Sequence, residues 1–191
     1  IASLGIRFHW NHNIDKKEFE NIQKSYDYIY IAVGAQKVNK LNVPGSNLYG
    51  VLDPIQFLSS IKSGKKINIG SKVAVIGGGN TAMDVARTAK RLVGENGEVV
   101  VLYRRTRSEM PAGYEEVNEL DIEGIKIQEL VAPEKINGEK GKVTEIVLSK
   151  MKLEGKDKQG RPKPVKIANS EFIMPFDTVI PATGQEVEID F

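Results

Sequence analysis

The sequence predicts an α/β fold: a parallel β-sheet built from βαβ units, with helices on both faces, plus an antiparallel three-stranded meander. Two short apolar runs, residues 73–76 and 99–103, flank a stretch with helical periodicity, which gives the order strand, helix, strand. From Pro133 to Met174 the pattern changes to longer strand-like runs joined by turn residues. The 191 residues, of which 40% are hydrophobic, suffice for one domain and part of another.

The first 45 residues predict a strand, a helix and a second strand. Residues 5–10 form the first predicted strand. The helix is predicted from Asp15 to Tyr26, because Asp15 can cap it and Glu18 follows three residues later, as in a capping box. Residues 27–34 predict the second strand, which ends in glycine and is apolar enough for burial on both faces.

The next segment leads into the central βαβ unit. Residues 43–45 read Val-Pro-Gly and indicate a turn. A helix is predicted at residues 53–62, with Asp53 as N-cap and Pro54 in the first position. After the strand at residues 73–76, a second helix is predicted to end at Gly94. One face of this helix carries residues at helical spacing, namely Ala82, Val85, Ala86, Ala89, Leu92 and Val93.

The remaining elements complete the parallel sheet and add the meander. A helix is predicted at residues 113–123, with Tyr114, Val117 and Leu120 on its apolar face, and a third parallel strand at residues 125–131. Two long strands at residues 143–153 and 165–174 are predicted to flank a turn. The basic residues of that turn fit either an anion-attracting group or an exposed hairpin tip; they are Lys156, Lys158, Arg161 and Lys163. Residues 176–181 predict a final buried strand.

The turn after residues 73–76 fits a phosphate-binding motif. Gly77, Gly79 and Ala82 match the pattern G-x-G-x-x-A. The first glycine permits a sharp turn, the second lets the backbone approach a pyrophosphate, and the third position must be small for close packing. The helix would direct its N-terminal amides at the phosphates, and Asn80 or Thr81 could cap its first turn or bind a phosphate. We therefore predict a Rossmann-like dinucleotide-binding unit, with a purely structural turn as the alternative.

The end of the second strand indicates which nucleotide is bound. A site for NAD usually carries Asp or Glu there, which accepts hydrogen bonds from the ribose hydroxyls. This chain has Tyr103, Arg104 and Arg105 instead, with Arg107 just beyond. A carboxylate would repel a 2′-phosphate, whereas guanidinium groups pair with it. The sequence therefore favours NADPH over NADH, with a solvated basic loop as the alternative.

Composition argues against several kinds of site and partner. The chain has no cysteine, so it holds no disulfide, thiolate zinc site or cysteine-ligated iron–sulfur cluster of its own. The only histidines, His9 and His12, have no evident third ligand, and no metal site is expected. The net charge of +2 is dispersed, which argues against a nucleic-acid surface. No apolar run reaches membrane-spanning length and no signal peptide is visible, so we expect a cytoplasmic protein with no membrane contact.

Four segments together resemble a known family. AVGAQ at residues 32–36 and PATGQ at residues 181–185 resemble the paired Ala-Thr-Gly segments of the flavoprotein oxidoreductases with two dinucleotide-binding domains, although Val33 stands where Thr is usual. GGGNTAMD at residues 77–84 and YRRTRSEMPA at residues 103–112 narrow the resemblance to the small (β) subunit of NADPH-dependent glutamate synthase. Dihydropyrimidine dehydrogenase and selenate reductase-like subunits share these features. The resemblance extends over essentially the whole chain.

The resemblance implies a domain organisation and a role for each matching residue. Residues 1–45 would be a remnant of the flavin-binding domain, residues 46–184 the NADPH-binding domain, and residues 185–191 the start of the return to the flavin domain. The pyrophosphate would lie against Gly77, Gly78, Gly79, Asn80, Thr81 and Ala82, and the 2′-phosphate against Arg104 and Arg105. Gly34 and Gly184 would mark the domain crossings, and Ala182, Thr183 and Gly184 would approach the nicotinamide or the flavin. No side chain is expected to act as a catalytic acid or base.

The resemblance also implies a function in a longer protein. NADPH would pass hydride to FAD, and electrons would continue to an iron–sulfur domain or subunit. The chain begins at Ile1 and lacks the flavin glycine fingerprint, the Gly-Asp flavin segment and the cluster cysteines, so we expect FAD not to be retained by this chain. The alternatives are a non-catalytic NADP(H)-binding sensor and a methyltransferase; the arginine pair argues against the methyltransferase.

Overall fold

The computed structural model describes residues 2–189, and the chain forms two units. One comprises Ile1–Lys37 and Glu186–Phe191, and the other Val38–Gln185. A two-stranded pair, β1 (Lys37–Val38) and β10 (Gln185–Glu186), coincides with the two sequence positions at which the chain passes between the units. The assignment of residues 1–45 and 185–191 to a flavin-binding domain stays a prediction.

The smaller unit contains the predicted helix but neither of the predicted strands. α1 (Lys16–Ser25) follows Asp15, whose side chain accepts a hydrogen bond from the Glu18 N–H at 2.8 Å, so the predicted cap is confirmed. The predictions of strands at residues 5–10 and 27–34 are wrong, and a 3-10 helix, η1 (Ala2–Leu4), precedes the first of these segments. A strand needs a hydrogen-bonded neighbour, and no described residue pairs with either segment. Tyr28 and Tyr30 are each 94% exposed.

The larger unit is organised around a parallel sheet with the order β4-β3-β2-β9. Its strands are β2 (Lys72–Ile76), β3 (Glu98–Leu102), β4 (Lys126–Gln128) and β9 (Thr178–Pro181). Val75 of the central strand pairs with Val101 on one side and Ile180 on the other. These strands confirm the four that the sequence predicts, with the third shorter than expected.

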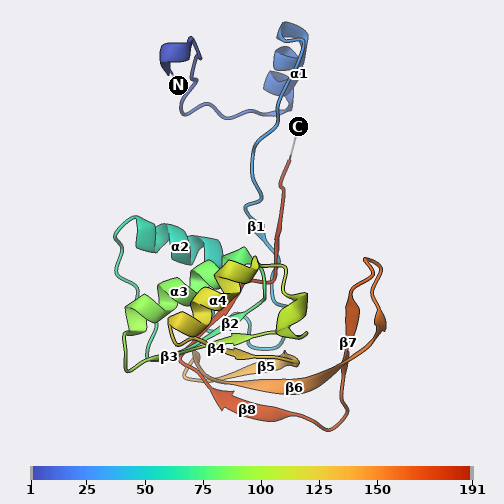
Figure 1. The fold of residues 1–191 in the computed structure, drawn as a ribbon. Coiled ribbons are helices and arrows are strands. Elements are labelled where there is room, and N and C mark those ends of the chain that lie inside the picture. The colour runs from blue at the N-terminus through green and yellow to red at the C-terminus, as the bar shows by residue number, and fades with distance from the viewer. Residues whose placement is uncertain (1, 190–191) are drawn as a thin grey trace. The chain divides into compact units, whose positions relative to one another are not determined.

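Three helices cover one face of this sheet (Figure 1). They are α2 (Pro54–Lys62), α3 (Asn80–Val93) and α4 (Tyr114–Ile122), and a 3-10 turn, η2 (Arg107–Glu109), precedes α4. The Asp53 carboxylate caps α2 by accepting from the N–H groups of Ile55 and Gln56, both at 2.9 Å. Gly94 ends α3 with a positive φ of 70°, as predicted.

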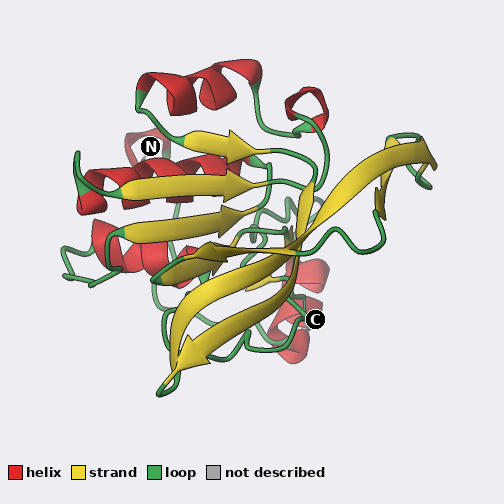
Figure 2. Ribbon diagram, turned by 90° about the horizontal axis from the view of Figure 1, so that it is seen from below, coloured by secondary structure: helices red, strands yellow, loops and turns green. Residues whose placement is uncertain are grey.

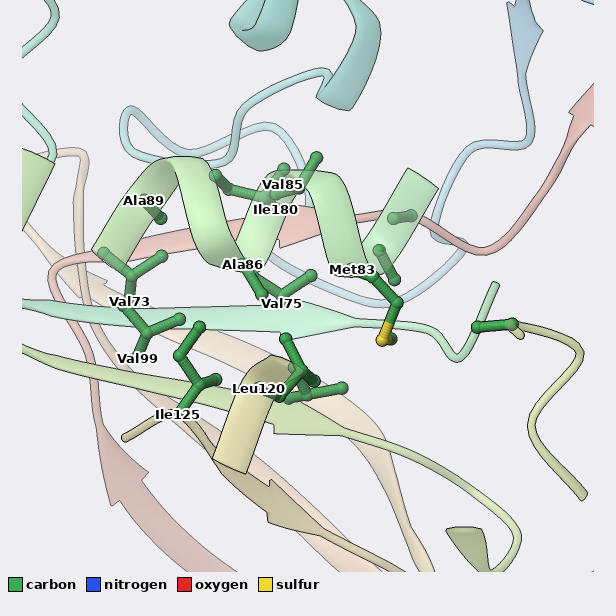
Figure 3. Close-up of a cluster of buried hydrophobic side chains, with 14 of the residues drawn as sticks. Val73, Val75, Met83, Val85, Ala86, Ala89, Val99, Leu120, Ile125 and Ile180 are labelled. Atoms are coloured by element: carbon green, nitrogen blue, oxygen red, sulfur yellow. The ribbon is translucent and has the colours of Figure 1, made fainter. Parts of the chain in front are cut away.

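Small residues let α3 lie close against the sheet. Ala86 and Ala89 are fully buried against Val73, Val75 and Val99, as Figure 3 shows. α4 adds Val117 and Leu120 to the same core. Tyr114 does not join them as predicted; it stands at the start of α4 and is 81% exposed.

The opposite face of the parallel sheet is covered by an antiparallel sheet. Its strands are β5 (Val131–Glu139), β6 (Lys142–Lys156), β7 (Pro162–Lys166) and β8 (Phe172–Pro175). β5, β6 and β7 form the predicted meander, and β8 pairs with β6 as a fourth strand. The strand predicted at residues 165–174 is divided between β7 and β8, which pair with successive parts of β6. Figure 2 shows β6 running beneath the parallel strands and on into a hairpin that projects from them.

The fold class is therefore confirmed, with one correction to its layers. The prediction of helices on both faces is wrong, because Ala74, Val100 and Leu102 pack against Ile136 and Ile146 of the antiparallel sheet. The apolar runs of the parallel strands show only that both faces are buried. A helix or a second sheet can supply that cover equally well. No helix among residues 2–189 is both long enough and apolar enough to cross a membrane.

Asp177 ties the start of the parallel sheet together. Its Oδ2 accepts hydrogen bonds from the Ser71 N–H at 2.7 Å, the Ser71 hydroxyl at 3.2 Å and the Lys72 N–H at 2.9 Å. Partial burial raises the pKa of this carboxyl, but the N–H groups of Ser71 and Lys72 together outweigh burial, so the pKa lies below its ordinary value. The ionised form therefore stabilises the folded state.

We expect Asp177→Asn to lower the free energy of unfolding at pH 7 by about 1 kcal/mol, because a neutral amide is a weaker acceptor. The difference from wild type should shrink as the pH falls below about 3.9 and through the lower folded-state pKa, where the wild-type carboxylate is itself protonated. Urea unfolding across that range measures it, with Asp84→Asn, at an exposed position of α3, as the control. A difference that is independent of pH would contradict this account.

Candidate nucleotide-binding cleft

A cleft of about 610 Å³ lies at the carboxyl ends of the parallel strands, within the Val38–Gln185 unit. Its wall includes the glycine turn after β2, the residues after β3 and the residues after β9. The antiparallel sheet contributes residues 131–133 and Arg161. The structure thus brings together every predicted cofactor-binding residue except Ala82, which lies beneath the wall, and Gly34, which belongs to the smaller unit. The role of Gly34 stays a prediction.

The first two glycines of the turn are required by the fold itself. Gly77 has a φ of 143°, and a Cβ there would lie 2.2 Å from the Ala182 carbonyl oxygen. A Cβ on Gly78 would lie 2.6 Å from the ring of Tyr103. Ala82 is fully buried where α3 meets the sheet. These positions explain why the turn tolerates only small residues, whether or not a ligand is present.

Gly79 is different, because nothing in the protein requires a glycine there. Its φ of −93° suits any residue, and the nearest atom to an added Cβ is the Pro111 Cγ at 3.9 Å. Gly79 is the N-cap of α3, with no side-chain cap. Within the described chain, the N–H groups of Gly79, Asn80 and Thr81 have no acceptor. The space beside Gly79 and these free donors together form a ready anion site.

The sequence allowed Asn80 to cap α3, but its side chain does not do so. Its Oδ1 instead accepts from the Gly113 N–H at 3.3 Å, which joins the start of α3 to the start of α4. Thr81 stays on the cleft wall and is half-buried. Of the two roles that the sequence allowed for these residues, phosphate binding is the one still open.

The two arginines after β3 have different environments. Arg104 is exposed on the cleft wall and has no hydrogen-bond or ion-pair partner among the described residues. Arg105 is only 3% exposed; its Nε donates to the Pro162 carbonyl oxygen at 2.7 Å, and its Nη2 donates to Asp157 Oδ2 at 2.8 Å. Arg105 therefore anchors the β6–β7 hairpin to the end of β3, and Arg104 is the free guanidinium of the pair.

Arg107, just beyond the pair, is also engaged within the protein. Its Nη2 donates to Asp121 Oδ2 at 2.6 Å and to the Val117 carbonyl oxygen at 3.0 Å, both on α4. The hydrogen bond to Asp121 raises the pKa of the guanidinium above its ordinary value. Arg107 does not line the cleft.

The segment after β3 forms a firm side wall. The Tyr103 hydroxyl donates to the Glu109 carbonyl oxygen at 2.8 Å, which holds the ring beneath Gly78. Glu109 closes a capping box with Thr106, whose hydroxyl lowers the pKa of the Glu109 carboxyl. Ala112 N–H donates to the Gly78 carbonyl oxygen at 3.1 Å. These bonds hold the segment after β3 against the glycine turn.

The residues after β9 form another part of the cleft wall. The Thr183 hydroxyl donates to the Asn39 carbonyl oxygen at 3.1 Å, and the Asn39 N–H donates to the Gly184 carbonyl oxygen at 3.0 Å. Gln185 carries a buried side-chain amide nitrogen without a hydrogen-bond partner in the described structure. No role is predicted for Gln185 from the sequence, although it closes the PATGQ segment and follows Gly184 directly.

No group of three His, Asp or Glu residues in the described part of the chain could hold a metal ion. The charged residues of the cleft wall are Arg104, Arg105 and Arg161, and no carboxylate lines it. The arginines of this wall suit a ligand that carries several negative charges. The free backbone N–H groups at the start of α3 can bind one of its anionic groups.

The chain resembles known proteins along nearly its whole length. Residues 4–191 match the family described as pyridine nucleotide-disulphide oxidoreductase. The chain is 36% identical over 195 residues to the NADP(+)-dependent formate dehydrogenase subunit beta of Moorella thermoacetica. That alignment covers 100% of this chain and 27% of that protein. It is 34% identical over 199 residues to the "Putative glutamate synthase [NADPH] small chain" of Cereibacter sphaeroides. That alignment covers 98% of this chain and 47% of that protein.

A solved structure has the same fold. Mycobacterium tuberculosis FprA in complex with NADPH aligns with 87% of this chain and 51% of its own, with a TM-score of 0.70 and 22% identity. The chain thus spans between about a quarter and a half of the two relatives' lengths. The resemblance carried by the four sequence segments is confirmed, and the chain belongs to the pyridine nucleotide-disulphide oxidoreductase family.

Proposed function

We propose that the cleft binds NADP(H). The N–H groups of Gly79, Asn80 and Thr81 would hold the pyrophosphate, and Arg104 would hold the 2′-phosphate of the adenosine. The observation that carries this proposal is Gly79, where the protein leaves room for a side chain but has none, next to three free donors at a helix N-terminus. The arginine-lined wall supports a ligand with an additional phosphate.

The names of the relatives support the same ligand. The formate dehydrogenase subunit is named for NADP(+), the glutamate synthase chain for NADPH, and the FprA structure contains NADPH. The ligand proposed from the cleft residues of this chain is therefore the nucleotide that the names of these relatives contain.

In the longer protein, this unit would serve a flavin-dependent oxidoreductase of the glutamate synthase small-subunit type. NADPH would supply a hydride to FAD, and electrons would pass on to an iron–sulfur domain or subunit. The residues of this chain bind and orient the nucleotide, and no side chain needs to act as an acid or base. Gly34, Ala182, Thr183 and Gly184 would lie toward the nicotinamide and the flavin, and the cysteine-free composition fits a cytoplasmic location.

Gly79→Ala should weaken NADPH binding by about tenfold or more, about 1.4 kcal/mol, because the added methyl group would occupy the space for the pyrophosphate. The fold should lose no more than about 1 kcal/mol, the usual cost of alanine at an N-cap. Gly113→Ala is the matched control, since Gly113 is the N-cap of α4 and an added Cβ meets nothing within 4 Å. Calorimetric titration and thermal unfolding of both variants measure these effects; equal binding in both would contradict the proposed site.

Arg104→Ala should weaken NADPH binding by about 1–3 kcal/mol and change NADH binding little, because only NADPH carries the 2′-phosphate. Arg105→Ala should mainly lower the free energy of unfolding, by about 1–3 kcal/mol, since it leaves the Pro162 carbonyl and Asp157 without their partner. Titrations with both nucleotides and urea unfolding separate the two effects. If Arg104→Ala weakened NADPH and NADH equally, the assignment of the 2′-phosphate would be wrong.

The redox role is tested in the longer protein rather than in this chain. Rapid mixing of the flavin-loaded protein with NADPH should bleach the flavin absorbance, and Gly79→Ala should slow the bleaching at subsaturating NADPH. A non-catalytic nucleotide sensor would bind NADPH but show no flavin spectrum and no bleaching, and that result would refute the redox role while leaving the nucleotide site intact.

A further inference from the structure

The β6–β7 hairpin projects from the body of the larger unit (Figures 1 and 2), but one residue of its turn lines the cleft. Arg161 stands at the end of that turn and lines the cleft wall, 57 positions after Arg104 in the sequence. The hairpin is therefore not only a peripheral extension of the antiparallel sheet. It adds a charged side chain to a site otherwise built from the ends of the parallel strands.

Asp157 holds this turn in one conformation. Its Oδ1 accepts from the N–H groups of Gln159 at 2.9 Å and Arg161 at 3.0 Å, which closes the turn. Its Oδ2 accepts from Arg105 Nη2 at 2.8 Å and from Arg161 Nε at 3.1 Å. One carboxylate thus fastens Arg161 to Arg105, and Arg105 fastens the hairpin to the end of β3.

The charges of this region leave a surplus for a ligand. Three guanidinium groups share the cleft wall, and Asp157, which does not line the wall, neutralises one of them. Arg105 and Arg161 each have their Nε and Nη2 engaged, Arg161 with Asp157 and the Gln159 Oε1, and neither Nη1 has a partner among the described residues. The two side chains differ in exposure: Arg105 is buried, whereas Arg161 is 43% exposed. Arg104 and Arg161 are therefore the two exposed guanidinium groups of the cleft wall that have a donor free for a phosphate.

We infer that Arg161 is a specificity residue for the 2′-phosphate and binds it from the β6–β7 hairpin, together with Arg104. This inference rests on the proposed NADP(H) site and extends it. The sequence pattern predicted two adjacent arginines after β3 as the phosphate clamp. The geometry replaces Arg105 in that clamp with a residue from a distant hairpin and gives Arg105 the task of holding that hairpin in place.

The test compares two nucleotides that differ only by the 2′-phosphate, adenosine 2′,5′-bisphosphate and 5′-AMP. Arg161→Ala should raise the dissociation constant of the bisphosphate about tenfold and that of 5′-AMP less than about twofold. Arg161→Lys should recover part of the loss, since an ammonium keeps the charge without the planar fork. Lys158→Ala is the matched control, because Lys158 is an exposed cation of the same turn that does not line the cleft.

Thermal unfolding of each variant checks that the hairpin substitution leaves the fold intact. If Arg161→Ala fails to fold, Arg161→Gln keeps a donor for Asp157 without the charge, and it should show the same selective loss. Equal binding of the bisphosphate to wild type and the folded Arg161 variant, with a loss in Arg104→Ala, would overturn the inference and leave the proposed site standing. If wild type bound neither nucleotide, both would fall.

Discussion

The close approach of β2 to both of its neighbours, β9 and β3, at the carboxyl ends of the strands is the constraint on which the cleft depends. Ala182 N–H donates to the Ile76 carbonyl oxygen at 2.7 Å, and Gly77 N–H donates to the Leu102 carbonyl oxygen at 3.1 Å. These two bonds keep the strands in register up to the point at which the chain leaves the sheet. The glycine turn and the segments that follow β3 and β9 therefore emerge at one edge, where the crevice of an open parallel sheet is found.

The sequence predicts this region well because its signals are local. The apolar run of β2, the small residues of α3, the caps at Asp53 and Asp15 and the stop at Gly94 each depend on neighbours within a few positions. A glycine turn between such elements has few other conformations available. The sequence could also place the arginines after β3 on the cleft, because the end of a parallel strand determines where the next residues lie.

The remaining features depend on partners that a pattern does not reveal. Residues 27–34 have the composition of a strand, but a strand forms only beside another strand. Arg105 and Arg104 look alike in the sequence, and the contact with Asp157, 52 positions later, decides that only one of them is free. Arg161 could not be separated from the other basic residues of its turn, because its position depends on how the hairpin folds back.

The two faces of the parallel sheet pack against different partners. On its helical side lies an apolar core in which Val85, Ala86 and Leu120 are fully buried. Its other side meets an antiparallel sheet whose hairpin extends to the cleft. The cleft wall thus takes residues from both sides of the sheet, with the glycine turn at the start of α3 and Arg161 in the hairpin of the antiparallel sheet.

The bond between Asn39 and Gly184 has a consequence for how such a unit is built into a protein. The first and last residues of the larger unit lie next to each other. If such a unit were inserted into another chain, the two residues that flank the insertion would stay close together. The inserted unit would then hold the two flanking residues together, and little conformational entropy would be lost in closing the loop. The larger unit therefore begins and ends at one place, as an inserted domain must.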